Sequence, residues 1–385
     1  MKPIYLDYNA TTPVDPKVFE TMLPFLRGDF GNPSSAYELG RRARNAIETA
    51  RAEVASLIGA LPDEILFTSG GTESVNLAIL GAVRHRPKKR PVVTSSIEHP
   101  ATDAVCGLLE QRGHELRRIA PQTNGCIDAD EMADAIDDDT ALVTLIHAQN
   151  EIGTLQPLEH VAAAARKHGA LTHADVAQSA GKVPIDVRAM GIDLLSIAGH
   201  KLYAPKGVGA LYVRRGIKLQ PVLVGAGQEH GMRPGTENVA GIVALGTACR
   251  IAEEKLDSEM IRQQELRDDL LIRLRHEVPE IRLVGNPAAR LPNTLNVLFP
   301  DVSGRQLLAS CPRVFASTGS ACHADREEAS AILRTLGIPE DEALGAVRLS
   351  LGRYTTQDEV GAAAASLGSA WRIAAATSRR LEFTA

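Results

Sequence analysis

Lys201 has the setting in this sequence that most favours covalent chemistry. It lies in the run SIAGHKLYAPKG, directly after a predicted buried strand and a Gly-His pair. A lysine buried at such a place loses proton affinity through desolvation, and its neutral amine can then form a Schiff base with a carbonyl compound. A lone lysine in a loop is more often a surface charge, so this interpretation depends on its neighbours.

Other polar side chains also follow predicted strands. Asp175 ends the strand in LTHADVAQSAG, and Gln178 comes one turn later. An ionised Asp175 could keep a pyridinium nitrogen protonated, which would make the ring an electron sink. His99 in SSIEHPA could stack on such a ring and move protons, and Asn150 in HAQNEIGT could offer its amide to a carboxylate or a ring oxygen. The simpler alternatives are a helix N-cap for Asp175 and a hydrogen-bonded loop residue for His99.

A glycine-containing turn joins a predicted strand to a predicted helix in FTSGGTESVNLAIL. Gly71 would let the backbone turn tightly. The free amides of the helix N-terminus, together with the Thr72 hydroxyl, could then hold a phosphate. The run is neither a Walker P-loop nor a GxGxxG motif, and a plain helix N-cap remains the alternative.

One of the five cysteines lies in an unusual setting. Four fit small buried positions, and the absence of a CxxC pair or a zinc-like Cys/His spacing predicts no metal site. Cys322 instead lies in the small, polar run STGSACHADREE. Arg348, in AVRLSLGRYTT, could bind a planar carboxylate through two parallel hydrogen bonds or could form a structural salt bridge.

The elements that must position these residues alternate between strands and helices. From about residue 63 to 215, strand-like runs such as EILFT, PVVTSS and ALVTLIHA alternate with helical patterns. This alternation predicts an α/β fold with a mostly parallel sheet and helices on both faces, and LLSIAG and GALYVRR should form a local strand pair. Because open α/β sheets bind ligands at the carboxyl ends of their strands, the candidate residues should converge there.

The second half of the chain predicts a smaller unit. Residues near 238–279 read as long helices that bridge to it, and an α+β pattern follows after about residue 280. A chain of 385 residues also exceeds the ~250–300 residues at which single cores stop growing. We therefore predict a large domain over residues 14–255 and a small domain formed by residues 1–13 and 256–385.

Composition excludes several classes of protein. Apolar residues make up 44% and charged residues 23% of the chain, and the net charge of -5 gives no general attraction for nucleic acid. The basic run at 84–91 is interpreted as a solvated turn. No apolar stretch approaches the ~18 residues of a membrane helix, and the N-terminus does not read as a signal peptide. We predict a cytoplasmic protein with no membrane partner and no direct nucleic-acid partner.

Taken in order, these motifs resemble the cysteine desulfurases of the NifS/IscS type, within the fold-type I, class V aminotransferase superfamily. The resemblance runs nearly from end to end, through YLDYNATTP, GNPSS, GTES, NEIG, GHK, RPGTEN, STGSACH and RLSLGR. It implies a pyridoxal 5'-phosphate cofactor and a large domain whose mostly parallel, seven-stranded sheet is flanked by helices. It also implies a smaller α+β domain and a homodimer with active sites near the subunit interface.

The resemblance implies roles for the residues around the cofactor ring. Lys201 would form the Schiff base, Asp175 would pair with the pyridine nitrogen, and His99 would stack on the ring. Gln178 would bind the phenolic oxygen.

It implies roles around the cofactor phosphate as well. Gly71 and Thr72 would bind the phosphate from the turn, and His200 would contact it from the other side. Thr236 would reach the phosphate of the partner subunit's cofactor.

For the reaction, the resemblance implies that Asn150 and Arg348 grip the carboxylate of L-cysteine while Lys201 moves its Cα proton. Cys322 would then attack the substrate sulfur, keep it as a persulfide, and release L-alanine. The persulfide would pass to an acceptor protein whose identity the sequence leaves open.

Some positions depart from the family pattern and keep alternatives open. Ala198 stands where many similar desulfurases carry a phosphate-binding serine, and His230 replaces a common arginine. The run ASTGSACHAD, preceded by Cys311, also resembles selenocysteine lyases, which would act on L-selenocysteine. A catalytically silent sulfur-relay scaffold and an aminotransferase are further alternatives, the latter leaving Cys322 without a role. The C-terminal run WRIAAATSRRLEFTA does not resemble the tail with which IscS-like desulfurases bind the iron–sulfur scaffold, so we expect that the acceptor can differ from theirs.

Overall fold

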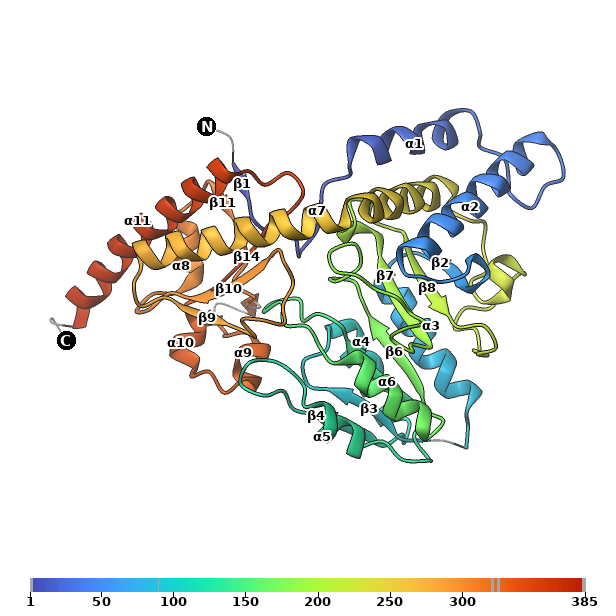
Figure 1. Ribbon diagram of the computed structural model, residues 1–385, viewed down its shortest axis with the longest axis horizontal. Coiled ribbons are helices and arrows are strands. Elements are labelled where there is room, and N and C mark those ends of the chain that lie inside the picture. Colours follow the sequence, from blue (N-terminus) through green and yellow to red (C-terminus); the bar gives the residue numbers. More distant parts are fainter. Residues whose placement is uncertain (1–2, 89, 320–321, 324–325, 383–385) are drawn as a thin grey trace.

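The computed structural model describes residues 3–88, 90–319, 322–323, 326–382. Two layered units lie side by side, and one long helix runs across both of them (Figure 1). The larger unit holds the main sheet, and the smaller one holds both termini of the described chain (Figure 1).

The main sheet has seven strands in the order β2-β8-β7-β6-β5-β3-β4. Only β8 runs antiparallel to its neighbours, β2 and β7, which confirms both the mostly parallel sheet and the predicted strand pair. The strands β3, β5, β6 and β7 are buried along their whole lengths, as expected where helices cover both faces. The bounds are β2 (Ile65–Thr68), β3 (Val92–Ser95), β4 (Leu116–Ile119), β5 (Leu142–Ile146), β6 (Leu171–Asp175), β7 (Leu194–Ala198) and β8 (Gly209–Val213).

Alternating strand residues face two separate cores. Leu66 and Leu142 pack with the helices α3 and α4 on one face, whereas Phe67 and Val143 pack with α2, α6 and the start of α7 on the other. This division follows from the period of two along a strand. The helices and 3-10 turns of this unit are α1 (Pro16–Arg27), α2 (Glu38–Leu57), η1 (Pro62–Glu64), α3 (Gly71–His85), α4 (Pro100–Gln111), α5 (Ala129–Asp134), α6 (Leu158–Lys167), η2 (Gly199–Lys201) and η3 (Gln228–Gly231).

The connection between the units is the helix α7 (Val239–Glu277), which is 39 residues long. It is a single helix, and at 1.5 Å per residue it spans about 58 Å. Asn238 caps its first turn by accepting a hydrogen bond from the Gly241 amide at 3.1 Å. Its first half packs against α1 and α2, and its second half packs against α11 of the small unit.

The small unit is built on the antiparallel sheet β14-β10-β9. Its separate apolar cluster includes Leu270 from α7, Val297 from β10 and Val347 from β14. The N-terminal strand β1 pairs with β11 of this unit, so the packing is consistent with the predicted domain division, which stays a prediction. The elements are β1 (Ile4–Tyr5), β9 (Arg282–Val284), β10 (Thr294–Leu298), α8 (Gly304–Ala309), β11 (Val314–Phe315), β12 (Cys322–His323), β13 (Arg326–Glu327), α9 (Ala331–Thr335), α10 (Glu340–Leu344), β14 (Ala346–Ser350) and α11 (Gln357–Glu382).

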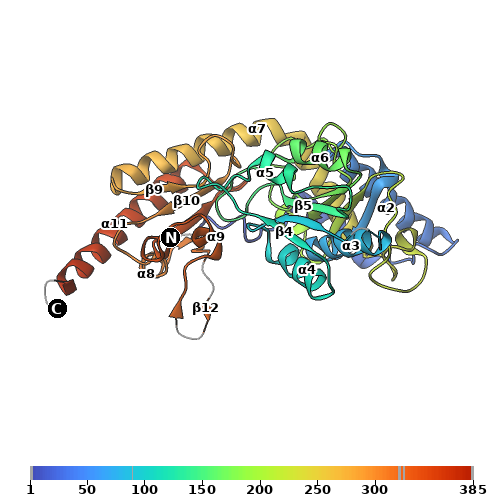
Figure 2. The same cartoon turned by 90° about the horizontal axis from the view of Figure 1, so that it is seen from below.

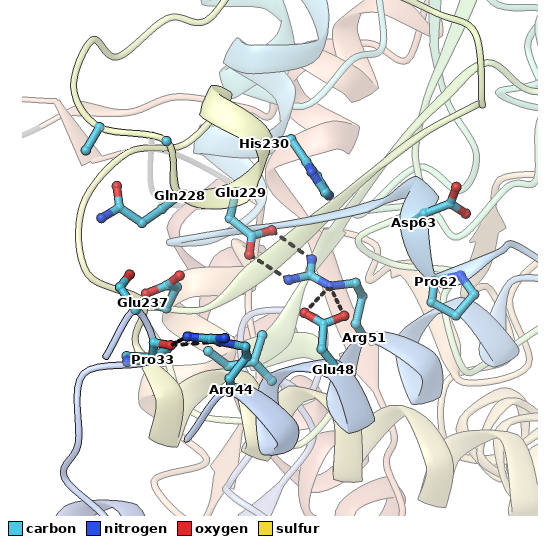
Figure 3. Close-up of a pocket in the computed structure, with 14 residues that line it drawn as sticks. Pro33, Arg44, Glu48, Arg51, Pro62, Asp63, Gln228, Glu229, His230 and Glu237 are labelled. Carbon is cyan, nitrogen blue, oxygen red and sulfur yellow. Dashed lines mark hydrogen bonds and ion pairs between the residues drawn. The ribbon is translucent and has the colours of Figure 1, made fainter. Parts of the chain in front are cut away.

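A buried ion pair fixes the turn that precedes α7. The Arg51 guanidinium donates to both carboxylate oxygens of Glu229, at 2.8 and 2.7 Å, and also to Glu48 at 3.2 Å (Figure 3). Glu229 accepts a further hydrogen bond from the Phe67 amide of β2 at 2.7 Å. Glu229 and His230 both adopt left-handed backbone conformations, with φ of 45° and 57°, so the turn depends on these contacts.

The sequence predicts a solvated basic run at 84–91 and no membrane-spanning helix. The basic run starts in the last two residues of α3, which ends at His85, and its side chains over 87–88 and at Arg90 are exposed, as expected of a solvated turn. Within the described residues, no helix combines the length and apolar character required to cross a membrane.

Candidate active site

A cavity opens at the carboxyl ends of the parallel strands, where the sequence predicts the site. Its walls come from the turns after β2, β3, β5, β6 and β7, and Val75, Ala101, Ile146, Ala177 and Ala198 supply small and apolar surface. The predicted residues that line it are Gly71, Thr72, His99, Asn150, Asp175, Gln178, His200 and Lys201.

Lys201 projects into this cavity from the short turn η2, which follows β7. Its amine donates hydrogen bonds to the backbone carbonyls of Asn9 and Ala10, the latter at 2.8 Å. Desolvation and the nearby Arg348 charge lower the pKa of Lys201 to about 8, against the opposing effect of Asp7 and Asp175. A neutral amine is therefore available near physiological pH, as a nucleophilic lysine requires.

Asp175 lies at the last position of β6, and its side chain is 5% exposed. Its Oδ1 accepts a hydrogen bond from the Ala177 amide at 2.9 Å. Burial raises the pKa of Asp175, while this hydrogen bond and the electrostatic interactions with His99 and Lys201 oppose the shift. A carboxylate with this setting would be stabilised by a cationic partner in the cavity.

His99 ends the loop after β3 and caps the helix α4 with its ring. Its Nδ1 accepts a hydrogen bond from the Ala101 amide at 3.1 Å, so a neutral ring carries its proton on Nε2. Desolvation lowers the pKa of His99, Asp175 opposes that shift, and Lys201 adds to it. The ring therefore favours the neutral form with a fixed tautomer.

The N-terminus of α3 has no side-chain cap. The N-cap position is Gly70, with φ of 151°, which has no side chain to cap the first turn. The Glu73 side chain accepts from the Ser69 amide at 2.8 Å and pairs with Arg233 at 3.0 Å, and it does not cap the amides of the first turn. Those amides begin at Gly71 and are free to bind an anion.

Ala198 and His200 line the cavity beside this helix terminus. A Cβ atom added to Gly71 would lie 3.1 Å from the Cβ of Ala198, so the absence of a side chain at Gly71 keeps the turn close to β7. The His200 Nδ1 lies 3.2 Å from the Thr11 hydroxyl. Desolvation and then Lys201 lower the pKa of His200 to about 4, which makes it a neutral hydrogen-bonding group.

Gln178 is buried and held at three points. Its Nε2 donates to the Asn9 carbonyl at 3.0 Å, and its Oε1 accepts from the Lys182 amine at 3.3 Å. The same amine donates to the Gln178 backbone carbonyl at 2.9 Å. Because a backbone carbonyl can only accept, the Asn9 oxygen fixes the amide nitrogen on its own side and leaves Oε1 facing Lys182.

Arg348 lies in the middle of β14 and is 6% exposed. It donates to Asp7 Oδ1 at 2.8 Å and to the Asn150 carbonyl at 3.1 Å. Its Nε is a buried donor without a hydrogen-bond partner among the described residues. The salt-bridge alternative for Arg348 therefore holds for one nitrogen, a second nitrogen binds the Asn150 carbonyl, and Nε is buried in this arrangement.

Comparisons with known proteins agree with this arrangement. Residues 4–362 match the family model described as aminotransferase class-V. This chain belongs to that family. A cysteine desulfurase IscS from Klebsiella pneumoniae (strain 342) is 46% identical over 364 residues, covering 93% of this chain and 90% of the relative. Within the class V aminotransferases, the chain therefore belongs with the cysteine desulfurases.

Solved structures show the same fold. A NifS-like protein superposes with a TM-score of 0.89 at 35% identity, covering 96% of this chain and 99% of the other. A structure named SspA in complex with cysteine superposes with a TM-score of 0.80 at 38% identity, covering 91% of this chain and 99% of the other. These likenesses confirm the predicted fold class.

Members of this family are pyridoxal-phosphate enzymes, and the cavity fits that group. The uncapped start of α3 suits the phosphate, the buried Asp175 carboxylate suits a cationic ring nitrogen, and the Lys201 amine suits an aldehyde. All three face one cavity. Among the residues that the structure describes, no group of three or more His, Cys, Asp or Glu side chains is placed to hold a metal ion.

Three predicted residues are not among those that line the cavity. Arg348 is one of them, although it contacts the cavity residue Asn150 through the Asn150 carbonyl. Thr236 is exposed in the loop before α7 and is not among the residues that line the cavity, so its predicted contact needs a second subunit. The backbone of Cys322 lies in β12, which pairs with β13 away from the body of the small unit (Figure 2). The thiol of Cys322 lies outside the described residues.

Sequence reasoning missed the contribution of the N-terminal segment. The carbonyls of Asn9 and Ala10 bind the Lys201 amine, and Asp7 pairs with Arg348. The run YLDYNATTP carried the signal, since a polar cluster directly after a strand has to satisfy its groups somewhere. Lys182 was also missed, because a lysine four residues after Gln178 reads as an ordinary surface residue.

Proposed function

We propose that this protein is a pyridoxal-phosphate-dependent cysteine desulfurase, which converts L-cysteine to L-alanine and keeps the sulfur on Cys322. The observation that carries the proposal is the shared cavity of Lys201, with its lowered pKa, and the buried carboxylate of Asp175. The cysteine desulfurase relatives and the neighbour in complex with cysteine support the same substrate.

Residues of this chain would hold the cofactor from several sides. Lys201 would bind it covalently, Asp175 would face its ring nitrogen, and His99 would lie against its ring. The Gln178 amide nitrogen would bind the phenolic oxygen with the hydrogen that Asn9 does not use. The first amides of α3, from Gly71 and Thr72, would bind the phosphate with help from His200.

The cofactor, when bound, stabilises negative charge at the carbon next to the amino group of its substrate. Lys201 moves the proton at that carbon. The carbonyls of Asn9 and Ala10 lie within hydrogen-bond reach of the amine, so they hold it near the cavity once the substrate has displaced it. Because the pKa of Lys201 is lowered to about 8, the amine can both accept and donate that proton near neutral pH.

The substrate carboxylate would bind between Arg348 and the Asn150 side chain. The Arg348 Nε has no hydrogen-bond partner in the part of the chain that the structure describes, and the ion pair with Asp7 orients the guanidinium. A carboxylate bound there would give this buried donor a hydrogen-bond partner. Such a hydrogen bond contributes more to the binding free energy than one that only replaces a hydrogen bond to water.

The sulfur transfer needs no added oxidant, because the carbon of the substrate is reduced as its sulfur is oxidised. The thiolate of Cys322 attacks the substrate sulfur, and a new sulfur–sulfur bond forms as the bond between the substrate's Cβ and its sulfur breaks. The electron pair of that bond stays with the carbon, which takes up a proton to become the methyl group of alanine. The persulfide on Cys322 then passes its outer sulfur to an acceptor protein.

The test combines a spectrum with a product assay. We expect the purified protein to show a visible absorption band that is lost in Lys201→Ala, and to release alanine and sulfide from L-cysteine with a thiol. Cys322→Ser should keep the band and lose persulfide formation, as read by mass spectrometry of the intact protein. Undiminished sulfide production by Cys322→Ser would contradict the proposal. A kcat/KM much higher for L-selenocysteine than for L-cysteine would instead favour a selenocysteine lyase.

We further propose that the protein works as a homodimer in the cytoplasm. Thr236 would then reach the phosphate of the other subunit's cofactor. Phe30 and Val224 are 74% and 94% exposed on the large unit, and a subunit contact would remove such apolar side chains from water. Sedimentation analysis of the loaded protein tests this, and a monomer at micromolar concentration would contradict it.

A further inference from the structure

The Glu151 carboxylate contacts two residues that flank Cys322 in the sequence. The Ser330 hydroxyl lies 2.5 Å from Glu151 Oε2. A Cβ atom added to Gly319 would lie 2.5 Å from that same oxygen, so the carboxylate occupies the space that a side chain at Gly319 would need. One oxygen atom therefore meets both the start and the end of the segment between 319 and 330.

The direction of the hydrogen bond to Ser330 follows from its partners. Ser330 caps the helix α9 by accepting from the Ile332 amide at 3.1 Å. An ionised carboxylate can only accept, so the hydroxyl donates its proton to Glu151 while it caps the helix. Hydrogen bonds to charged acceptors are the shorter and stronger kind, which agrees with the 2.5 Å separation.

Glu151 is itself part of the loop that would bind the substrate. The adjacent Asn150 lines the cavity, and its carbonyl accepts from Arg348 at 3.1 Å. The Glu151 amide donates to Gln149 Oε1 at 2.6 Å, and its carbonyl accepts from Asn296 at 3.2 Å. The main chain of Glu151 is therefore hydrogen-bonded to one residue of the large unit and to one of the small unit. These bonds fix the position from which its carboxylate extends.

We propose that Glu151 is a positioning residue for sulfur transfer. It binds the Ser330 end of the Cys322 segment through a hydrogen bond and packs against the Gly319 end, and it adjoins the loop carrying Asn150. This inference rests on the proposed function, in which Cys322 must meet a substrate bound beside Asn150. The burial of Glu151 costs free energy, which Ser330 and Arg348 offset in part. A carboxylate used only to support the cap of α9 would affect stability alone and leave the chemistry unchanged.

The experiment separates cysteine binding from sulfur transfer in the cofactor-loaded protein. Glu151→Ala and Glu151→Gln are compared with the wild type and with Glu64→Gln, a matched control. Glu64 is buried, whereas Glu151 is half-buried, and the Glu64 carboxylate likewise accepts hydrogen bonds, from the Leu61 and Arg215 amides at 2.9 and 2.8 Å. Binding is read from the L-cysteine concentration that half-saturates the visible spectral change. Transfer is read from the rate at which persulfide appears on Cys322 after rapid quenching, by mass spectrometry.

We expect Glu151→Ala to slow persulfide formation by roughly tenfold or more, with half-saturation changed by no more than about twofold. Glu151→Gln should stay within about threefold of the wild type, because its amide oxygen still accepts from Ser330. Equal rates in Glu151→Ala and Glu64→Gln would overturn the inference. So would a loss of cysteine binding in Glu151→Ala as large as the loss of rate.

A second pair of variants keeps the inference testable if Glu151→Ala does not fold. Ser330→Asp preserves a good cap for α9 but places a second carboxylate against Glu151, so it should slow transfer as Glu151→Ala does. Adding Glu151→Gln to Ser330→Asp should restore the rate, because the amide can donate to the new carboxylate. Failure of this rescue overturns the inference. A wild type that forms neither alanine nor persulfide would instead contradict the proposed function.

Discussion

Arg51 contacts two carboxylates that differ in burial, and this makes a matched pair of variants. The side chains of Arg51 and Glu229 are 7% and 3% exposed, whereas that of Glu48 is 59% exposed. Both carboxylates lie against the same guanidinium (Figure 3). We predict that Glu229→Gln strongly destabilises the protein and that Glu48→Gln scarcely affects it.

The expected magnitudes follow from the two environments. Glutamine at 229 would keep one oxygen, which can still accept from the Phe67 amide and from one Arg51 nitrogen. Its amide nitrogen would face the other Arg51 nitrogen, and two donors would then lie against each other. Removing one member of a buried pair costs about 3–5 kcal/mol, because the remaining charge stays buried without compensation. An exposed pair contributes about 0–1 kcal/mol, which bounds the effect of Glu48→Gln.

The measurement is urea unfolding followed by circular dichroism, with hydrogen exchange at the Phe67 amide as a local probe. Glu229→Gln should lower the unfolding midpoint and speed exchange at Phe67, whose amide donates to Glu229. Glu48→Gln should leave both within error of the wild type. Equal effects of the two substitutions would refute the reasoning, since burial would then not decide the strength of the pair.

Three further predictions concern the cavity. The rate at which cofactor-free protein binds pyridoxal phosphate should rise with pH around a midpoint of about 8, the lowered pKa of Lys201. The rate is read from the growth of the visible absorption band. A midpoint near 10.5, the ordinary pKa of lysine, would contradict this prediction. Ala198→Ser should retain the cofactor several-fold more tightly by adding a donor beside Gly71, and unchanged or weaker retention in equilibrium dialysis would count against it. Folding lowers the pKa values of Lys182 and Lys201 from 10.5 to about 7 and 8. Above these lowered values, the unfolded chain therefore binds more protons than the folded protein does. The urea midpoint of cofactor-free protein should therefore rise from about pH 7 to 10, and Lys182→Met should flatten that rise.

Much of the fold could be predicted because it rests on local patterns. The alternation of strand and helix from 63 to 215 indicated the parallel sheet, and the predicted strand pair became β7 and β8. The long helical stretch became α7, although the sequence did not indicate that it is one continuous helix. The resemblance implied the identity of the cavity residues, and the strand ends explained why they meet.

Contacts between distant segments escaped prediction for a physical reason. The bond from Lys201 to Asn9 joins residues 192 positions apart, and the pair of Arg348 with Asp7 joins residues 341 positions apart. Periodicity tells which face of an element is buried, but it carries no information about which loop lies opposite.

The sequence by itself determined the kind of chemistry, because residue types at strand ends and the order of the motifs are local properties. Only the tertiary structure decided how that chemistry is tuned. Burial beside Arg348 lowers the pKa of Lys201, and the packing of two units brings Glu151 against Ser330, 179 positions away. Desolvation and charge interactions depend on the three-dimensional surroundings of a group, and these exist only once the chain has folded.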